Sequence, residues 1–99
     1  MFARLTTTVL GSDEPDETEE IMGNLLPTLR GLPGFKGVLV ISNAETRVIH
    51  GITLWDSAEA MERSRSVMDG LRDAETSSRE VVAQETAGFE VTAIYLARP

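Results

Sequence analysis

Three observations on this 99-residue chain indicate an α+β fold: four segments rich in β-branched residues, helical spacing of apolar residues between them, and the order of these segments. The order is strand, helix, strand, strand, helix, strand. Right-handed crossovers around a central hairpin then give a four-stranded antiparallel sheet with both helices on one face. This is the ferredoxin-like β-α-β-β-α-β arrangement, predicted here as a single domain over residues 1–99.

The first half of the chain predicts one helix between two strands. Residues 2–10 (FARLTTTVL) and 35–42 (FKGVLVIS) are typical of strands. The helix is predicted over residues 15–31, where one face carries the apolar residues Ile21, Met22, Leu25, Leu26 and Leu29. Pro27 removes one helical hydrogen bond, and the run Leu32-Pro33-Gly34 ends the helix.

The second half begins with a hairpin. A polar connection over residues 43–46 leads into a third strand over 47–55 (RVIHGITLW), antiparallel to the second. Asp56 and Ser57, with Glu59 three residues after Asp56, resemble a capping box at a helix start. The inner stripe of this second helix is predicted to contain Ala58, Met61, Arg65, Met68 and Leu71 or Arg72.

The last part of the chain predicts more helix and then a strand. We expect a further helical segment over residues 74–85, anchored by Val81 and Val82. The final strand is predicted over residues 87–97 (AGFEVTAIYLA).

Composition excludes several classes of site. The chain has no cysteine, which excludes disulfides, Cys-ligated metals and thiol nucleophiles, and its single histidine excludes a multi-histidine metal site. The net charge of −7 argues against nucleic acid and against anionic membranes as partners. Six acidic residues between Asp13 and Glu20 complement the dipole at a helix start, or form an acidic interaction patch. Without a signal-like start or a membrane-length apolar run, we expect a cytoplasmic protein.

Both faces of the predicted sheet carry apolar residues. Strict alternation puts Phe35, Leu39 and Ile41 on one side of the second strand, and Val38 and Val40 on the other. Two helices cover only one face, and the other would be a large apolar patch on a monomer. Burying on the order of 600 Å² per subunit would contribute roughly 15 kcal/mol before association costs. We expect a homodimer through the helix-free face; a monomer with moderately hydrophobic strands is the alternative.

Two runs resemble a known family. The run Leu32-Pro33-Gly34-Phe35-Lys36-Gly37 and the later run over residues 52–61 (ITLWDSAEAM) resemble the dimeric α+β barrel superfamily, and more narrowly antibiotic biosynthesis monooxygenase-like (ABM) domains. The resemblance covers nearly the whole chain. It implies a dimeric α+β barrel with a pocket between the sheet and the helices of each subunit. In the ABM enzymes this pocket accepts a flat polyketide phenol or anthrone, which O₂ oxidises to a quinone without metal or flavin.

One residue of this chain matches a functional residue of the family, and other functional residues of the family have no match here. Trp55 matches the tryptophan that ends the third strand in the quinone-forming and haem-degrading branches. Active members pair it with an asparagine, whereas Gly51 and Thr53 share its face here. The haem-degrading branch uses a helix-borne histidine and an asparagine on the first strand. Here the second helix has no histidine and the first strand offers threonines at 6–8, which argues against haem degradation.

His50 and Trp55 are the candidate catalytic residues. His50 is the only imidazole and the most natural general base; a structural or interfacial histidine is the alternative. Trp55 either lines the pocket or wedges between the sheet and the second helix. Alternation along the strand puts the two on opposite faces, so only one of them would line a pocket under the helices.

The candidate ligand-binding residues are Trp55, Arg72, Tyr95, Met61 and Met22. Arg72 and Arg65 could bind a phenolate or carboxylate, or pack through their stems with the guanidinium in water. Tyr95 could donate a hydrogen bond to a bound oxygen, or cap the last strand. Methionines are adaptable core residues that also line apolar pockets.

Two functions remain open. The first is a cofactor-free, ABM-like monooxygenase acting on a small aromatic or polyketide-type substrate. The second is a non-catalytic dimeric module that binds a small apolar ligand or assists a pathway enzyme.

Overall fold

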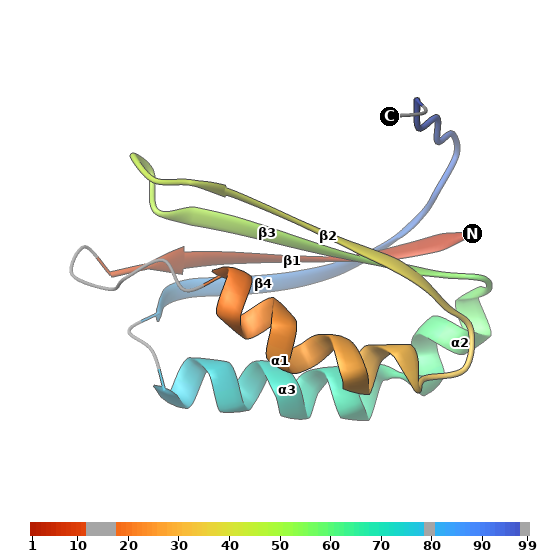
Figure 1. Ribbon diagram of the computed structural model, residues 1–99, viewed down its shortest axis with the longest axis horizontal. Helices are drawn as coiled ribbons and strands as arrows, with labels where there is room; N and C mark the ends of the chain where they lie inside the picture. Colours follow the sequence, from red (N-terminus) through yellow and green to blue (C-terminus); the bar gives the residue numbers. More distant parts are fainter. Residues whose placement is uncertain (12–17, 79–80, 98–99) are drawn as a thin grey trace.

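The computed structural model describes residues 1–11, 18–78 and 81–97. Its elements are β1 (Phe2–Leu10), α1 (Thr18–Arg30), β2 (Phe35–Asn43), β3 (Val48–Trp55), α2 (Ala58–Arg63), α3 (Arg65–Ser78) and β4 (Val81–Glu90). The strands form one antiparallel sheet in the order β2-β3-β1-β4, and all three helices lie on one face of it (Figure 1). The predicted α+β, ferredoxin-like fold is confirmed. Four of the six acidic residues counted between Asp13 and Glu20 lie outside the described residues, and the other two, Glu19 and Glu20, lie in the first turn of α1.

The register of β1 decides which side chains lie beneath the helices. Arg4 lies opposite Thr53 of β3 and Gly88 of β4. Thr6 lies two residues further along, on the same side of the strand. The helix-covered face of β1 therefore carries three polar residues at even positions, Arg4, Thr6 and Thr8, whereas Ala3, Leu5 and Val9 face the other way.

The region between the third strand and the last differs from the sequence prediction. The predicted second helix is two helices, because α2 ends at Ser64, whose side chain donates a hydrogen bond to the Met61 carbonyl (2.7 Å). Ser57 is the N-cap and its Oγ accepts from the Ala60 amide at 3.1 Å, so the cap is one residue later than the Asp56-based box. Arg65 is exposed, and its predicted place in the inner stripe is wrong.

The predicted helix over 74–85 is wrong from residue 81 onward, because β4 begins at Val81. Tertiary pairing outweighs the helical pattern there, since Val81 pairs with Leu10 at the end of β1. The predicted strand over 87–97 is wrong at its other end. The last ladder bond is Val91 N–H to the Met1 carbonyl (2.9 Å), and beyond it β1 offers no further partner. Residues 91–97 accordingly have no regular secondary structure.

The connection from α1 to β2 also departs from simple alternation. A register shift between Phe35 and Gly37 turns Phe35 toward the helix side, where its ring meets Trp55 edge-on at 5.6 Å. Strict alternation placed Phe35 with Leu39 and Ile41, and that assignment is wrong. Gly34 before it has φ = 81°, and a Cβ there would lie 2.7 Å from Asp56 Oδ1, so only glycine fits.

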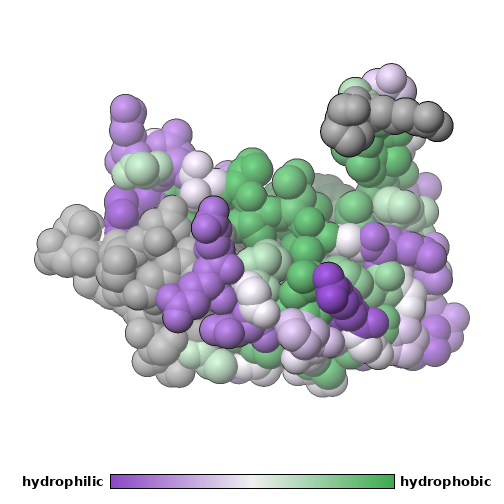
Figure 2. Space-filling model, viewed as in Figure 1, coloured by the Kyte–Doolittle hydropathy of each residue, from purple (hydrophilic) through white to green (hydrophobic). Residues whose placement is uncertain are grey.

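The face of the sheet away from the helices is apolar and uncovered. Leu39, Ile41 and Phe89 are each at least half exposed on it. The segment 91–97 leaves the sheet on this side (Figure 1), and Figure 2 shows hydrophobic residues along the same side and on that segment. We call this the open face. Within the described part of the chain, no helix has the length and hydrophobicity of a membrane span.

Candidate functional site

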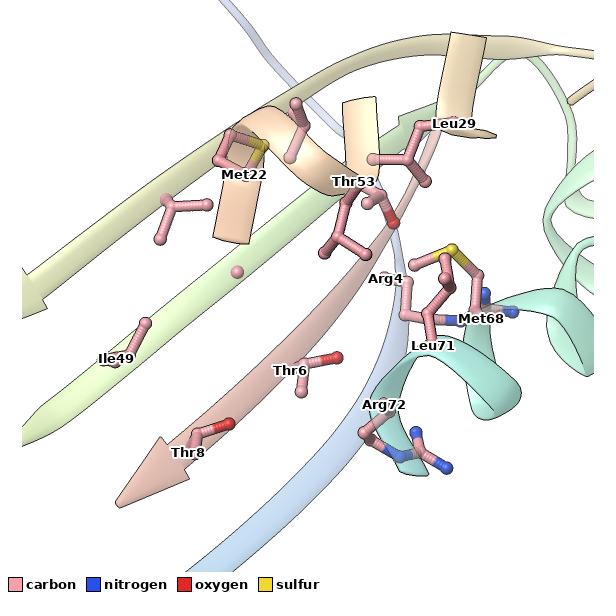
Figure 3. Close-up of a pocket in the computed structure, with 14 residues that line it drawn as sticks. Arg4, Thr6, Thr8, Met22, Leu29, Ile49, Thr53, Met68, Leu71 and Arg72 are labelled. Carbon is pink, nitrogen blue, oxygen red and sulfur yellow. The ribbon is translucent and has the colours of Figure 1, made fainter. Parts of the chain in front are cut away.

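A pocket of about 120 Å³ lies between the sheet and the helices α1 and α3 (Figure 3). Its walls are mostly apolar, and the side chains come from α1, β2, β3 and α3. The main apolar contributors are Met22, Leu25, Leu29, Val40, Ile49 and Met68. The volume is close to that of the ~150 Å³ apolar cavity that binds benzene in an engineered protein. One aromatic ring therefore suits the pocket in the geometry seen here, and a second ring would extend toward its open side.

Polar groups enter the pocket from β1, β3 and α3. The threonines are Thr6, Thr8 and Thr53, and the cations are Arg4 and Arg72. No His, Cys, Tyr, Asp or Glu is among the pocket-lining residues that the structure describes. The pocket is therefore an apolar cavity with hydroxyls and two guanidinium groups on its polar side.

Arg4 is the buried cation of the pocket, with 8% of its surface exposed. Its guanidinium donates to the Met61 carbonyl at 2.8 Å and to Ser64 Oγ at 3.1 Å. The side chain extends from β1 toward α3, beside Met68 (Figure 3). Burial lowers the pKa of Arg4, because a low-dielectric surrounding disfavours the charged form. Asp69 opposes that shift as the nearest carboxylate that acts on it.

Arg72 lies at the more open end, with its side chain 27% exposed. It pairs with Asp69 at 2.8 Å and donates to Thr86 Oγ1 of β4 at 2.7 Å. The charge of Arg72 is therefore compensated by an ion pair with Asp69, whereas Arg4 has no ion pair among the described residues. Of the ligand-binding residues predicted from sequence, Arg72 and Met22 both line the pocket.

Trp55 lies on the helix-covered face but beneath the pocket wall. It is fully buried, and its indole N–H donates to Thr53 Oγ1 at 3.0 Å. Thr53 lines the pocket and Trp55 does not. In this geometry Trp55 is connected to the pocket through the Thr53 hydroxyl, which accepts its indole N–H, and its ring is not part of the pocket lining.

His50 lies on the open face, as strand alternation predicted. Its Nδ1 is 3.0 Å from the hydroxyl of Thr7 on β1. With Ile41 and Val48 it lines a separate, wider groove near the β2–β3 turn. The sheet thus separates His50 from the pocket under the helices, and any catalysis by His50 would take place on the open face.

The remaining predicted residues lie outside the pocket. The Met61 side chain packs against Gly88 of β4, where a Cβ would come within 3.1 Å of the Met61 Cε. Tyr95 is 89% exposed in the segment 91–97. Neither residue is among those that line the pocket.

Sequence reasoning did not select Arg4, Thr53 or Met68 for the pocket. One signal was present in the sequence: alternation along residues 2–10 puts Arg4, Thr6 and Thr8 on one face, and that face is the one beneath the helices. A polar stripe on the covered side of a central strand is unusual, since such groups need partners once buried.

The residues present do not fit a histidine-ligated haem. The single imidazole is on the other side of the sheet, and a volume of about 120 Å³ is far smaller than a porphyrin. Among the described residues, no group of three or more His, Cys, Asp or Glu could hold a metal ion.

The sequence matches no protein-family model, and it matches no curated protein. Solved structures do match over nearly the whole chain. An antibiotic biosynthesis monooxygenase-like protein from Deinococcus radiodurans superposes with a TM-score of 0.74 and 14% identity, covering 100% of both chains. The ActVA-Orf6 monooxygenase of Streptomyces coelicolor, in complex with nanaomycin D, superposes with a TM-score of 0.73 and 16% identity, covering 98% of this chain and 92% of that one.

The same fold also carries a different activity. The haem degrader MhuD from Mycobacterium tuberculosis, with two haems bound in its active site, superposes with a TM-score of 0.70 and 16% identity. This match covers 96% of this chain and 99% of MhuD. At these identities the likeness establishes architecture and leaves activity to the site itself. The chain therefore has the fold of the antibiotic biosynthesis monooxygenase-like proteins.

Proposed function

We propose that this protein is a cofactor-independent, oxygenase-like enzyme acting on a small aromatic substrate in the pocket under the helices. The observation that carries the proposal is the pairing of an apolar cavity with a cationic end. Met22, Leu29 and Met68 offer apolar surface for rings and for O₂, and Arg4 and Arg72 offer positive charge. The fold shared with a monooxygenase supports the same conclusion.

The chemistry that fits is oxidation of a phenol by O₂. For 1-naphthol the balance is one O₂ consumed, one oxygen atom added to the ring carbon, and the second released as water. The phenolic and ring hydrogens leave in that water, and the product is 1,4-naphthoquinone. A phenolate reacts with O₂ more readily than a phenol does, and guanidinium groups favour the phenolate electrostatically.

A non-catalytic ligand-binding module is the second candidate function. One observation favours it: none of the described lining residues is an ordinary general base. The nearest carboxylate is Asp69, which is held by Arg72 at 2.8 Å. Both candidate functions require that the protein binds a small ligand. They differ in whether the protein then oxidises that ligand.

Oxygen uptake with 1-naphthol separates the two candidate functions, using Gly51→Val to fill the pocket. A Cβ at Gly51 meets no heavy atom within 4 Å, and a β-branched residue suits a strand, so the variant should fold. Gly70→Ala on exposed α3 is the matched control, because its Cβ also meets nothing. We expect uptake by the wild type and Gly70→Ala, and at least tenfold less by Gly51→Val. No uptake by the wild type, or equal uptake by all three, would refute the oxygenase and leave the binding module.

We also propose that two copies associate through the open face. Leu39 is 55% exposed and Phe89 is 52% exposed on it. A second apolar surface lies on the segment after β4, where Tyr95 is 89% and Leu96 81% exposed. One chain covers neither surface within its described residues, whereas a second copy would cover both.

A further inference from the structure

Arg4 is a buried cation without an ion pair among the described residues. The ion pairs of this region join Arg65 to Glu62 and Arg72 to Asp69, and both are surface or partly exposed pairs. Arg4 instead has two neutral acceptors, the Met61 carbonyl and Ser64 Oγ. A charge held this way costs free energy, since neutral dipoles replace hydration only in part.

We propose that Arg4 recognises a carboxylate, and that the pocket takes a small aromatic ligand carrying a single carboxylate group. The inference rests on the proposed ligand pocket and names the chemical class that it accepts.

The charges around the pocket favour a ligand with a single negative charge. Arg4 and Arg72 contribute two positive charges, and Asp69 beside Arg72 contributes one negative charge. The net charge of this cluster is therefore +1, in a chain whose overall charge is −7. One carboxylate would neutralise it. The cationic pocket is a local feature, because only nine residues of the chain are Lys or Arg.

The donors of Arg4 support a carboxylate in particular. A guanidinium has five N–H groups in a planar fork, and Arg4 uses two of them on protein acceptors. Three therefore remain for a ligand. Paired N–H groups match the two oxygens of a carboxylate, which makes such contacts short and selective.

A structural role for Arg4 is the competing explanation. Its bond to the Met61 carbonyl places positive charge near the end of α2, where it complements the helix dipole. A neutral donor or solvent could serve a carbonyl there. That role would also not require Arg4 to line a cavity, which it does (Figure 3).

The test is calorimetric binding of 2-naphthoate and its neutral isostere, 2-naphthamide. We expect the wild type to bind 2-naphthoate at least tenfold more tightly than 2-naphthamide, which is the scale of a charge-assisted hydrogen bond. Arg4→Met should abolish this preference, because it should weaken the binding of 2-naphthoate at least tenfold more than the binding of 2-naphthamide. Arg4→Lys, which keeps the charge and loses the fork, should retain part of it. The matched control is Arg65→Met, at an exposed arginine that begins α3, and this variant should retain the full preference.

Equal binding of the two ligands by the wild type would overturn the proposal, and this comparison holds even if Arg4→Met fails to fold. A preference that survives in Arg4→Met, or is lost equally in Arg65→Met, would also overturn it. Binding is measured without turnover, so the outcome is separate from the oxygenase test. Preference without oxygen uptake would leave this inference standing and the oxygenase refuted. Oxygen uptake without a preference for 2-naphthoate would leave the oxygenase standing and this inference refuted.

Discussion

Each face of the sheet carries some side chains that are unusual there in a monomer: buried polar groups on the covered face, and large exposed apolar groups on the open face. Beneath the helices lie Arg4, Thr8 and Thr53, all buried. On the open face lie Leu39 and Ile41, both at least half exposed. A covered face is ordinarily the apolar one, because burial of apolar surface stabilises the fold and burial of polar groups opposes it. Both features fit the two proposals made above: a small aromatic carboxylate as ligand under the helices, and a second copy of the chain on the open face.

The buried polar groups of the covered face come largely from β1, the strand between β3 and β4. Its residues at even positions point to the helices, and among them are an arginine and two threonines. Ala3, Leu5 and Val9 point to the open face. The predictions that follow replace one residue on one face at a time, and compare it with a matched change elsewhere.

The largest effect is expected on the open face from Ile41→Glu. This side chain is 50% exposed in the single chain and would lie in the dimer interface. Burying an unpaired carboxylate there should weaken the dimer by at least about 100-fold, or roughly 3 kcal/mol. The measurement is mass by light scattering across a dilution series. Val67→Glu introduces the same charge at an exposed position of α3 and should leave the mass unchanged. A wild-type mass near one chain at micromolar concentration would contradict the dimer.

A smaller effect is expected on the covered face from Thr53→Val. The variant leaves the buried Trp55 indole N–H without its acceptor, which costs about 1–3 kcal/mol of unfolding free energy. Thr6→Val is the control on the same face, because among the described residues its hydroxyl has the exposed Thr86 hydroxyl as its partner. We expect a change within about 0.5 kcal/mol there. The measurement is the unfolding free energy from chemical denaturation. Equal losses in Thr53→Val and Thr6→Val would contradict the role of Thr53 as the acceptor for the Trp55 indole.

The smallest effect is expected from Arg4→Met. The variant removes two hydrogen bonds that stabilise the fold, and it also removes a buried charge whose desolvation opposes folding. Because these effects offset each other, the unfolding free energy should stay within about 1 kcal/mol of the wild-type value or rise. The lowered pKa of Arg4 means that its charge disfavours the fold at every pH below that pKa, with relief only as pH rises through it. Arginine stays charged near neutrality, so the difference should be constant from about pH 6 to about pH 8. A loss above about 2 kcal/mol would mark Arg4 as a structural residue.

The fold could be predicted because it depends on local patterns. The helical spacing of Met22, Leu25 and Leu29 and the hairpin between β2 and β3 are visible in sequence. The boundaries of β4 were wrong, because they depend on pairing with β1, whose residues Phe2 and Leu10 lie opposite Glu90 and Val81. The position of Phe35 was wrong, because a bulge is set by how β2 meets β3. Long-range pairing outweighs local propensity at both places.

The site was predictable only in part. Alternation separated His50 from Trp55, and Arg72 and Met22 were selected as ligand residues from helix faces. Arg4 was missed because an isolated arginine in a strand is ordinarily a surface residue. Its importance depends on burial and on having no carboxylate partner, and both are properties of the assembled tertiary structure.

The most direct test of the two-face account uses the isoleucine methyl groups as reporters in NMR spectra. Ile49 lines the pocket, and Ile41 and Ile52 lie on the open face. We expect 2-naphthoate to shift the Ile49 signal and leave Ile41 and Ile52 unchanged. Dilution should shift Ile41 and Ile52 and leave Ile49 unchanged. Shifts of Ile41 and Ile52 on adding 2-naphthoate, with Ile49 silent, would place the ligand on the open face and contradict the account.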